Sequence, residues 1–82
     1  MNNELAALGR NIRRVRKRLE LSQEAMAEKC GLHRTYISDI ERGNRNPSFS
    51  SLVMMSRGLG LTVSELTKNI ECPPPKELSR ET

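Results

Sequence analysis

The segment from Ser22 to Gly43 constrains the fold of this chain more than any other part of the sequence. It reads SQEAMAEKCGLHRTYISDIERG and has the pattern of two short helices joined by a tight turn. Ala27 is small enough to let two helices cross closely, and Gly31 adopts the positive φ of a tight turn at little cost. Ile37 and Ile40 lie three residues apart, so they face the same side of the second helix. The segment therefore predicts a helix-turn-helix motif.

Length and composition favour one small helical domain. The 82 residues include one Tyr, one Phe and no Trp, which suits a small helical core and suits a β-sandwich poorly. The three prolines that follow Cys72 end regular structure. We therefore expect one domain over residues 1–71 and a flexible polar tail over residues 72–82.

The sequence gives little support for catalysis or for membrane insertion. Its longest apolar runs are too short to span a bilayer, and its N-terminus lacks the apolar stretch of a signal peptide. Cys30 and Cys72, with the single His33, make neither a disulfide framework nor a metal site, and no nucleophile is arranged with a base. We therefore expect a cytoplasmic protein that is not an enzyme and that binds no metal, cofactor or small-molecule ligand.

Hydrophobic spacing and capping residues predict five helices and an all-α fold. Ser22 and Ser48 are suitable N-caps, and so are Thr62 and Ser64, whereas His33 is a poor cap for the helix that follows it. The predicted helices span about residues 4–20, 23–30, 33–43, 49–60 and 62–70. The first of them has an apolar stripe at helical spacing, made of Leu5, Leu8, Ile12, Val15 and Leu19.

The excess positive charge of the chain lies in the first predicted helix. Residues 1–20 carry six basic and two acidic side chains, whereas residues 21–82 carry eight of each, so the formal net charge of +4 comes from the first segment. A basic face beside a helix-turn-helix is typical of contact with nucleic-acid phosphates, and a solvated basic surface without a partner is the alternative. Of its outward cations we favour Arg13 and Lys17 as contacts to the DNA backbone.

The outward face of the helix over residues 33–43 is the candidate for reading bases. At about 100° per residue, Thr35, Ser38, Asp39 and Arg42 face outward, and Arg34 near the N-terminus can reach out. An Arg can hold guanine O6 and N7 in a bidentate fork, and a Thr can contact a thymine methyl group. We therefore predict base contacts from Arg34 and Thr35, with Ser38 and Asp39 as weaker candidates. The alternative is an amphipathic helix with a solvated polar face.

Several polar residues around that helix suit the DNA backbone. Gln23 begins the preceding helix, where free backbone N–H groups favour a phosphate, although Gln is also simply a good helix former. The loop Asn44-Arg45-Asn46, which follows the predicted base-reading helix, offers one cation between two amides, although it can also be an ordinary polar turn. The predicted backbone contacts are Arg13, Lys17, Gln23, His33, Arg42, Asn44, Arg45 and Asn46.

Two charged residues of opposite sign occupy positions that should face inward. Arg16 falls within the apolar stripe of the first helix, and Glu41 falls on the inner face of the helix over residues 33–43. A lone buried charge is very costly, so the two should pair. We predict a structural ion pair that joins these two helices.

The last two predicted helices carry more apolar residues than one small core needs. Leu52, Met55 and Leu59 form one stripe that should reach the core together with Phe49. The remaining apolar side chains would form a surface for a second copy of the chain, unless they simply close the core. A two-fold dimer would place its reading helices about 34 Å apart, on an inverted-repeat operator. The predicted dimer interface consists of Val53, Met54, Val63, Leu66 and Ile70.

These residues together resemble the lambda-repressor-like, Cro/C1-type helix-turn-helix proteins, also called the xenobiotic-response-element type. The family's compact five-helix domain agrees with the helices predicted above, and many members have the Arg16–Glu41 pair. The resemblance covers about residues 8–70 and rests on Ile12-Arg13, Arg16, Leu21-Ser22-Gln23-Glu24, Ala27, Gly31, Tyr36-Ile37-Ser38, Ile40-Glu41-Arg42-Gly43, Arg45, Pro47-Ser48 and Leu52.

Within that family, the strings over residues 34–38 and 44–48 look like those of controller proteins of restriction–modification systems. The resemblance implies a dimer that binds operators near its own promoter, times endonuclease expression and contacts RNA polymerase. It also implies DNA contacts from Arg34, Thr35, Tyr36 and Arg45, and a dimer interface on the last two helices. His33 and the proline-rich tail after Cys72 depart from the family pattern.

The function predicted from the sequence is that of an autoregulatory, sequence-specific transcription regulator acting on double-stranded operator DNA. A phage-type or chromosomal repressor is the alternative within this class. An antitoxin-like module that binds a protein partner as well as DNA is the alternative from another class.

Overall fold

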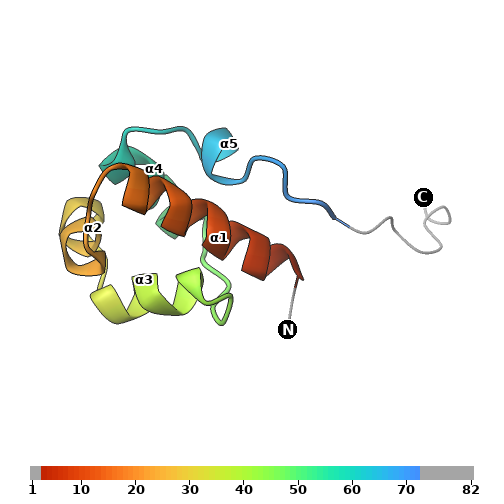
Figure 1. Cartoon of the computed structure of the whole chain (residues 1–82), viewed down its shortest axis with the longest axis horizontal. Helices are drawn as coiled ribbons and strands as arrows, with labels where there is room; N and C mark the ends of the chain where they lie inside the picture. The colour runs from red at the N-terminus through yellow and green to blue at the C-terminus, as the bar shows by residue number, and fades with distance from the viewer. Residues whose placement is uncertain (1–2, 73–82) are drawn as a thin grey trace, which may run out of the picture.

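The computed structural model describes residues 3–72, which form five α-helices and no strand (Figure 1). The all-α, five-helix fold predicted from the sequence is confirmed for this part of the chain, whereas the predicted tail lies outside the described residues from 73 onward. No helix within this part of the chain has the length and apolar character needed to cross a bilayer. The helices are α1 (Asn3–Arg18), α2 (Gln23–Cys30), α3 (Arg34–Glu41), α4 (Phe49–Leu59) and α5 (Val63–Leu66).

Side-chain caps explain where most of the helices begin. The Ser22 side chain accepts a hydrogen bond from the backbone N–H of residue 25, and Ser48 accepts one from the N–H of residue 51. Thr62 and Glu65 form a reciprocal capping box at the start of α5. His33 occupies the cap position of α3 without a side-chain hydrogen bond, as its residue type predicts. Local sequence therefore determines these boundaries, with α3 the exception.

The core lies where the helices converge. In Figure 1, α1 runs through the middle of the molecule, with α3 on one side of it and α5 on the other. Helix α3 packs on α1 and α2, and α4 packs on α2 and α5. Every helix contributes at least one side chain that is removed almost entirely from water: Ile12, Met26, Ile37, Ile40, Met55 and Leu66.

Helix α1 approaches α3 so closely at Gly9 that no side chain fits. A Cβ atom at Gly9 would lie 2.5 Å from the carbonyl oxygens of both Ile40 and Glu41. These are backbone atoms at the end of a packed helix, so they cannot move aside as a flexible side chain would. The packing of α1 against α3 therefore requires glycine at this position.

We expect Gly9→Ala to destabilise the fold by about 1–3 kcal/mol, because the methyl group must push α1 away from α3. This loss should appear even though Ala is the better helix former. Denaturant unfolding of the variant, with Arg10→Ala on the exposed side of the same turn as control, measures the difference. An unchanged midpoint for Gly9→Ala would show that the two helices separate easily.

Two large apolar side chains that we expected in the core lie at the surface. Leu19 is 47% exposed, because it lies beyond the last residue of α1, Arg18, where the positive φ of Glu20 (59°) turns the chain away. Phe49 is 70% exposed. It is the first residue of α4 and lies roughly 100° around the helix axis from the centre of the buried face. The predictions that placed these two side chains inside are wrong.

The fifth helix is shorter than predicted, ending at Leu66 rather than near Ile70. The Asn11 side chain donates hydrogen bonds to the carbonyl oxygens of Leu66 and Lys68, at 2.9 and 3.0 Å. A continuing helix would instead direct backbone N–H groups at these oxygens. Asn69 has a positive φ of 61°, which an α-helix excludes. A contact from α1 therefore replaces the last turn of the predicted helix.

Candidate nucleic-acid interface

Helices α2 and α3 form the helix-turn-helix that the sequence predicts. Gly31 ends α2 with a φ of 73°, and the backbone N–H of Leu32 donates to the carbonyl oxygen of Ala27 at 2.9 Å. Ala27 is buried at this crossing, as its small size predicts. Ile37 and Ile40 hold one side of α3 on the core, so its opposite side stays open. This open side is the candidate interface.

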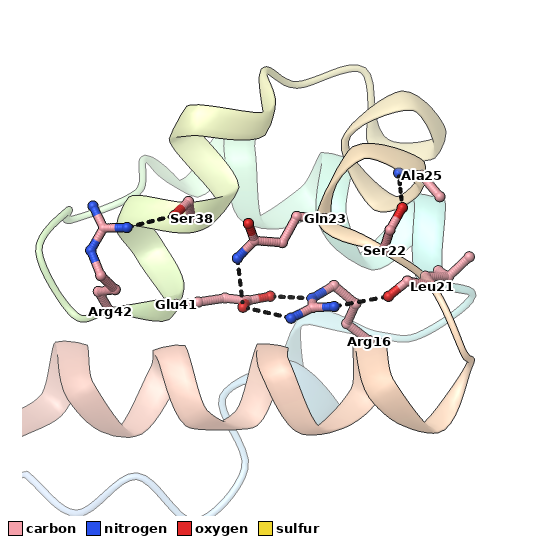
Figure 2. Close-up of polar contacts among 8 residues, drawn as sticks. All are labelled: Arg16, Leu21, Ser22, Gln23, Ala25, Ser38, Glu41 and Arg42. Atoms are coloured by element: carbon pink, nitrogen blue, oxygen red, sulfur yellow. Dashed lines mark hydrogen bonds and ion pairs between the residues drawn. The ribbon is translucent and has the colours of Figure 1, made fainter.

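A buried ion pair joins α1 to the end of α3, as we predicted (Figure 2). The Arg16 Nε donates to Glu41 Oε2 at 2.6 Å, and the Arg16 Nη2 donates to Oε1 at 3.0 Å. The remaining guanidinium nitrogen of Arg16, Nη1, donates to the carbonyl oxygen of Leu21 at 2.8 Å. The two charged side chains are only 10% and 3% exposed, and the hydrogen bonds to Glu41 raise the pKa of Arg16. Bidentate geometry and full pairing offset the cost of burying both charges.

Gln23 takes part in the same network, which the sequence did not reveal. Its Nε2 donates to Glu41 Oε1 at 3.1 Å, so the first residue of α2 is tied to the last residue of α3 (Figure 2). We predicted a phosphate contact for this amide, and one of its two N–H donors is instead used within the chain. Only the tertiary arrangement places Gln23 beside Glu41, because 18 residues separate them.

The first turn of α3 presents its polar side chains to solvent. Arg34 and Thr35 are both exposed, as predicted. Arg34 Nε lies 3.7 Å from Glu24 Oε2, and both side chains are at least half exposed. Such a surface pair contributes little and is screened by salt, so the guanidinium group is free to exchange this carboxylate for another acceptor. Arg34 is therefore available to a ligand on the open side of α3.

The polar side chains in the second turn of α3 already bind other side chains of the chain. The guanidinium group of Arg42 donates to the Ser38 hydroxyl and to the Asp39 carboxylate, and the first of these contacts is drawn in Figure 2. The other carboxylate oxygen of Asp39 lies 3.9 Å from Arg45 Nη1. Ser38 and Asp39 were predicted to read bases, but here they hold two cations. Contact between Asp39 and a base would require the Arg42 contact to break.

Tyr36 connects α3 to the start of α4. Its hydroxyl donates to Ser51 Oγ at 2.9 Å, and the Arg45 guanidinium lies 4.8 Å from the centre of its ring. Ser51 also receives a hydrogen bond from the hydroxyl of the cap residue Ser48. Tyr36 is half-buried, so only part of it faces outward. These contacts position the loop over residues 44–48 beside α3.

The remaining predicted backbone contacts surround this surface. Relative to Gly9, which faces α3, the α1 residues Arg13 and Lys17 lie roughly 40° and 80° around the helix axis. They therefore flank the side of α1 on which α3 lies. The full set of these exposed residues is Arg13, Lys17, His33, Asn44 and Asn46.

The residues predicted for a dimer interface fall into two groups. Val53, Met54, Val63 and Ile70 are half-buried, so each keeps apolar surface in contact with water. Leu66 is fully buried within this chain and has no surface for a partner. It closes the core between α5 and the rest of the domain, so placing it in the interface was wrong.

The described residues hold no cluster suited to metal binding, and one of their two free thiols is buried. No three His, Cys, Asp or Glu side chains within residues 3–72 lie close enough together to hold a metal ion. Cys30 is buried against Gly58, and its burial raises the pKa of the thiol. A buried thiol with a raised pKa is a poor nucleophile, so its role here is to pack.

Comparison with known proteins agrees with this geometry. A family model described as helix-turn-helix matches residues 12–66. The control protein C.BamHI of Bacillus amyloliquefaciens is 44% identical over 66 residues, which cover 79% of this chain and 82% of that protein. The crystal structure of the restriction–modification controller protein C.AhdI from Aeromonas hydrophila has a TM-score of 0.78 at 34% identity, covering 79% of this chain and 98% of that chain.

A structure determined with DNA shows the same fold. The biofilm regulator SinR in complex with DNA has a TM-score of 0.71 at 35% identity, covering 74% of this chain and 98% of that chain. The family match extends from α1 to the end of α5, so it includes the helix-turn-helix and both partners of the buried ion pair. The chain therefore belongs to the Cro/C1-type helix-turn-helix family, in which its relatives include control proteins of restriction–modification systems.

Proposed function

We propose that this protein is a sequence-specific DNA-binding transcription regulator that controls a restriction–modification system. The observation that carries the proposal is the asymmetry of α3: Ile37 and Ile40 are locked in the core, while Arg34 and Thr35 project from its open side. Such a helix fits the major groove, with residues near its N-terminus against base edges. Its similarity to relatives named as control proteins, one of them from a restriction–modification system, favours a controller over other transcription regulators.

In the proposed complex, Arg34, Thr35 and Tyr36 read bases from the first turn of α3. Arg42 and Arg45, which contact the Asp39 carboxylate in the free chain, bind DNA phosphates instead. Ser38 and Asp39 then serve as secondary base contacts. The surrounding residues bind the sugar–phosphate backbone through the side chains of Arg13, Lys17, Gln23, His33, Arg42, Asn44, Arg45 and Asn46.

The proposed active form is a homodimer on an inverted-repeat operator. Val53, Met54, Val63 and Ile70 supply its interface, because each retains apolar surface outside the core. Such a regulator responds to its own concentration in the bacterial cytoplasm. It activates by contact with RNA polymerase at low occupancy and represses at high occupancy.

A gel-shift titration tests the proposal directly. The probe is DNA from upstream of the gene that encodes this chain, with random duplex as competitor at physiological salt. We expect binding that survives competition and that proceeds in steps of one dimer per inverted repeat. Weak, salt-sensitive binding equal to that of random duplex would contradict the proposal and favour a module whose main partner is a protein.

Replacing Arg34 with Ala should relax base specificity. We expect affinity for the operator to fall by about 1–3 kcal/mol, because a bidentate base contact is lost. Affinity for random duplex should fall much less. Arg57→Ala, which removes the same charge from an exposed site on α4, is the control and should alter both affinities little. Equal losses on operator and random DNA for Arg34→Ala would refute the base-reading role of this residue.

A further inference from the structure

A second cationic surface lies on the part of α1 that faces α5. Here the two elements enclose a groove of about 520 Å³, whose rim carries Arg10, Arg14, Arg18 and Lys68. Among the described residues that line it, Glu65 is the only one with an acidic side chain. The lining thus carries four positive charges and one negative charge, which is a strong local excess for one small groove.

Within residues 3–72, no carboxylate neutralises the rim cations. Arg14 donates to the Asn11 side chain at 3.1 Å, but none of the four cations makes an ion pair with a residue in the described range 3–72. The Glu65 carboxylate is occupied by the capping box with Thr62. All four cations are exposed. Among the described residues, the groove therefore keeps its excess of positive charge.

The groove faces away from the proposed DNA interface. Relative to Gly9, which touches α3, the row of Arg10, Arg14 and Arg18 lies roughly 100–180° around the α1 axis. Figure 1 shows α5 and α3 on opposite sides of α1. A duplex bound along α3 would consequently leave Arg14 and Arg18, at roughly 140° and 180°, uncovered, whereas Arg10 borders the position of Lys17. Part of the excess charge of α1 thus lies on a side of the helix that DNA on α3 does not use.

We propose that this groove binds an acidic segment of a partner protein. Its lining combines the apolar side chains of Ala7, Val15 and Leu61 with the four cations. A peptide with carboxylates beside apolar side chains matches both features, whereas a duplex presents only a convex surface of phosphates and sugars. The two binding surfaces are separate, so the protein can hold DNA and the acidic segment at once.

The probe for the experiment is a fluorescein-labelled twelve-residue peptide of alternating Glu and Leu, titrated with the full chain at physiological salt. The groove variant is Arg18→Gln/Lys68→Gln, which spares Arg14 and its bond to Asn11. The matched control is Arg13→Gln/Lys17→Gln, which removes the same charge from the other face of α1. Circular dichroism verifies that both variants fold. A second peptide with Ser in place of Leu tests the contribution of the apolar lining residues.

We expect the groove variant to bind the peptide about tenfold more weakly, which is the combined effect of two surface ion pairs, and to bind operator DNA normally. The control should show the opposite pattern. DNA-saturated protein should bind the peptide as tightly as free protein, and the Ser peptide should bind more weakly. The proposal does not depend on DNA recognition by α3, because the peptide titration is independent of the operator.

Three results would overturn the proposal. Equal loss of peptide affinity in both variants would mean that net charge alone attracts the peptide. Weaker DNA binding in the groove variant, with peptide binding unchanged, would assign the groove to DNA phosphates. Peptide binding too weak to measure with the unaltered chain would exclude an acidic partner of this kind.

Discussion

Replacing Glu41 with Ala is expected to destabilise the fold by about 3–5 kcal/mol. The substitution leaves the buried Arg16 guanidinium without its two carboxylate acceptors, so only the Leu21 carbonyl oxygen remains, and it removes the acceptor of the Gln23 amide. A small domain has only about 5–15 kcal/mol of total stability, so the variant should unfold near or below physiological temperature. Thermal unfolding followed by circular dichroism measures the effect.

Two comparisons separate this mechanism from a general loss of negative charge. Glu28→Ala removes an exposed carboxylate from α2 and should change stability by no more than about 0.5 kcal/mol. Replacing both partners, as in Arg16→Met/Glu41→Leu, should recover much of the loss because no unpaired charge remains buried. A melting temperature for Glu41→Ala close to that of the unaltered chain would contradict the structural role of the pair.

Replacing Leu66 with Ala is expected to cost about 2–5 kcal/mol, because the side chain is fully buried and its loss leaves a cavity. The loss should appear in the unfolding free energy and not in the affinity between two copies of the chain. Denaturant unfolding and sedimentation equilibrium measure these two quantities separately.

The matched control for Leu66 is Val63→Ala, on the same short helix. Val63 is half-buried, so its truncation should cost less stability. If Val63 belongs to the proposed dimer interface, its truncation should weaken association instead. Weakened association with unchanged stability for Leu66→Ala would show that this side chain serves a partner and not the core.

The motif itself was predictable because its signals are local. Ser22 and Gly31 cap α2 through the backbone of their own helix, and such bonds need no tertiary partner. The ion pair was predictable for a different reason. An inward position on each of two amphipathic helices carried a charge, and burial of either charge alone would be prohibitive. Each helix pattern therefore placed one charge inward, and the cost of an unpaired buried charge identified its partner on the other helix.

Helical periodicity misplaced several apolar residues near helix ends. Phe49 and Leu19 match a core pattern, yet both are exposed, whereas Leu66 matches a surface pattern and is fully buried. Helical periodicity assigns a residue to a face, but it assumes that the helix continues. The ends of α1 and α5 are decided by positive-φ residues and by contacts from Asn11, which periodicity cannot detect.

The sequence by itself determined the helix-turn-helix, most helix starts, the buried charge pair and the outward face of α3, because each depends on short-range capping, periodicity or the cost of an unpaired charge. Only the tertiary structure decided that Gln23 binds Glu41, that Asp39 holds Arg42, and that the cations of α1 are divided between two faces. These features depend on how the helices pack against one another, and that packing reflects the free energy of the whole core rather than any one segment.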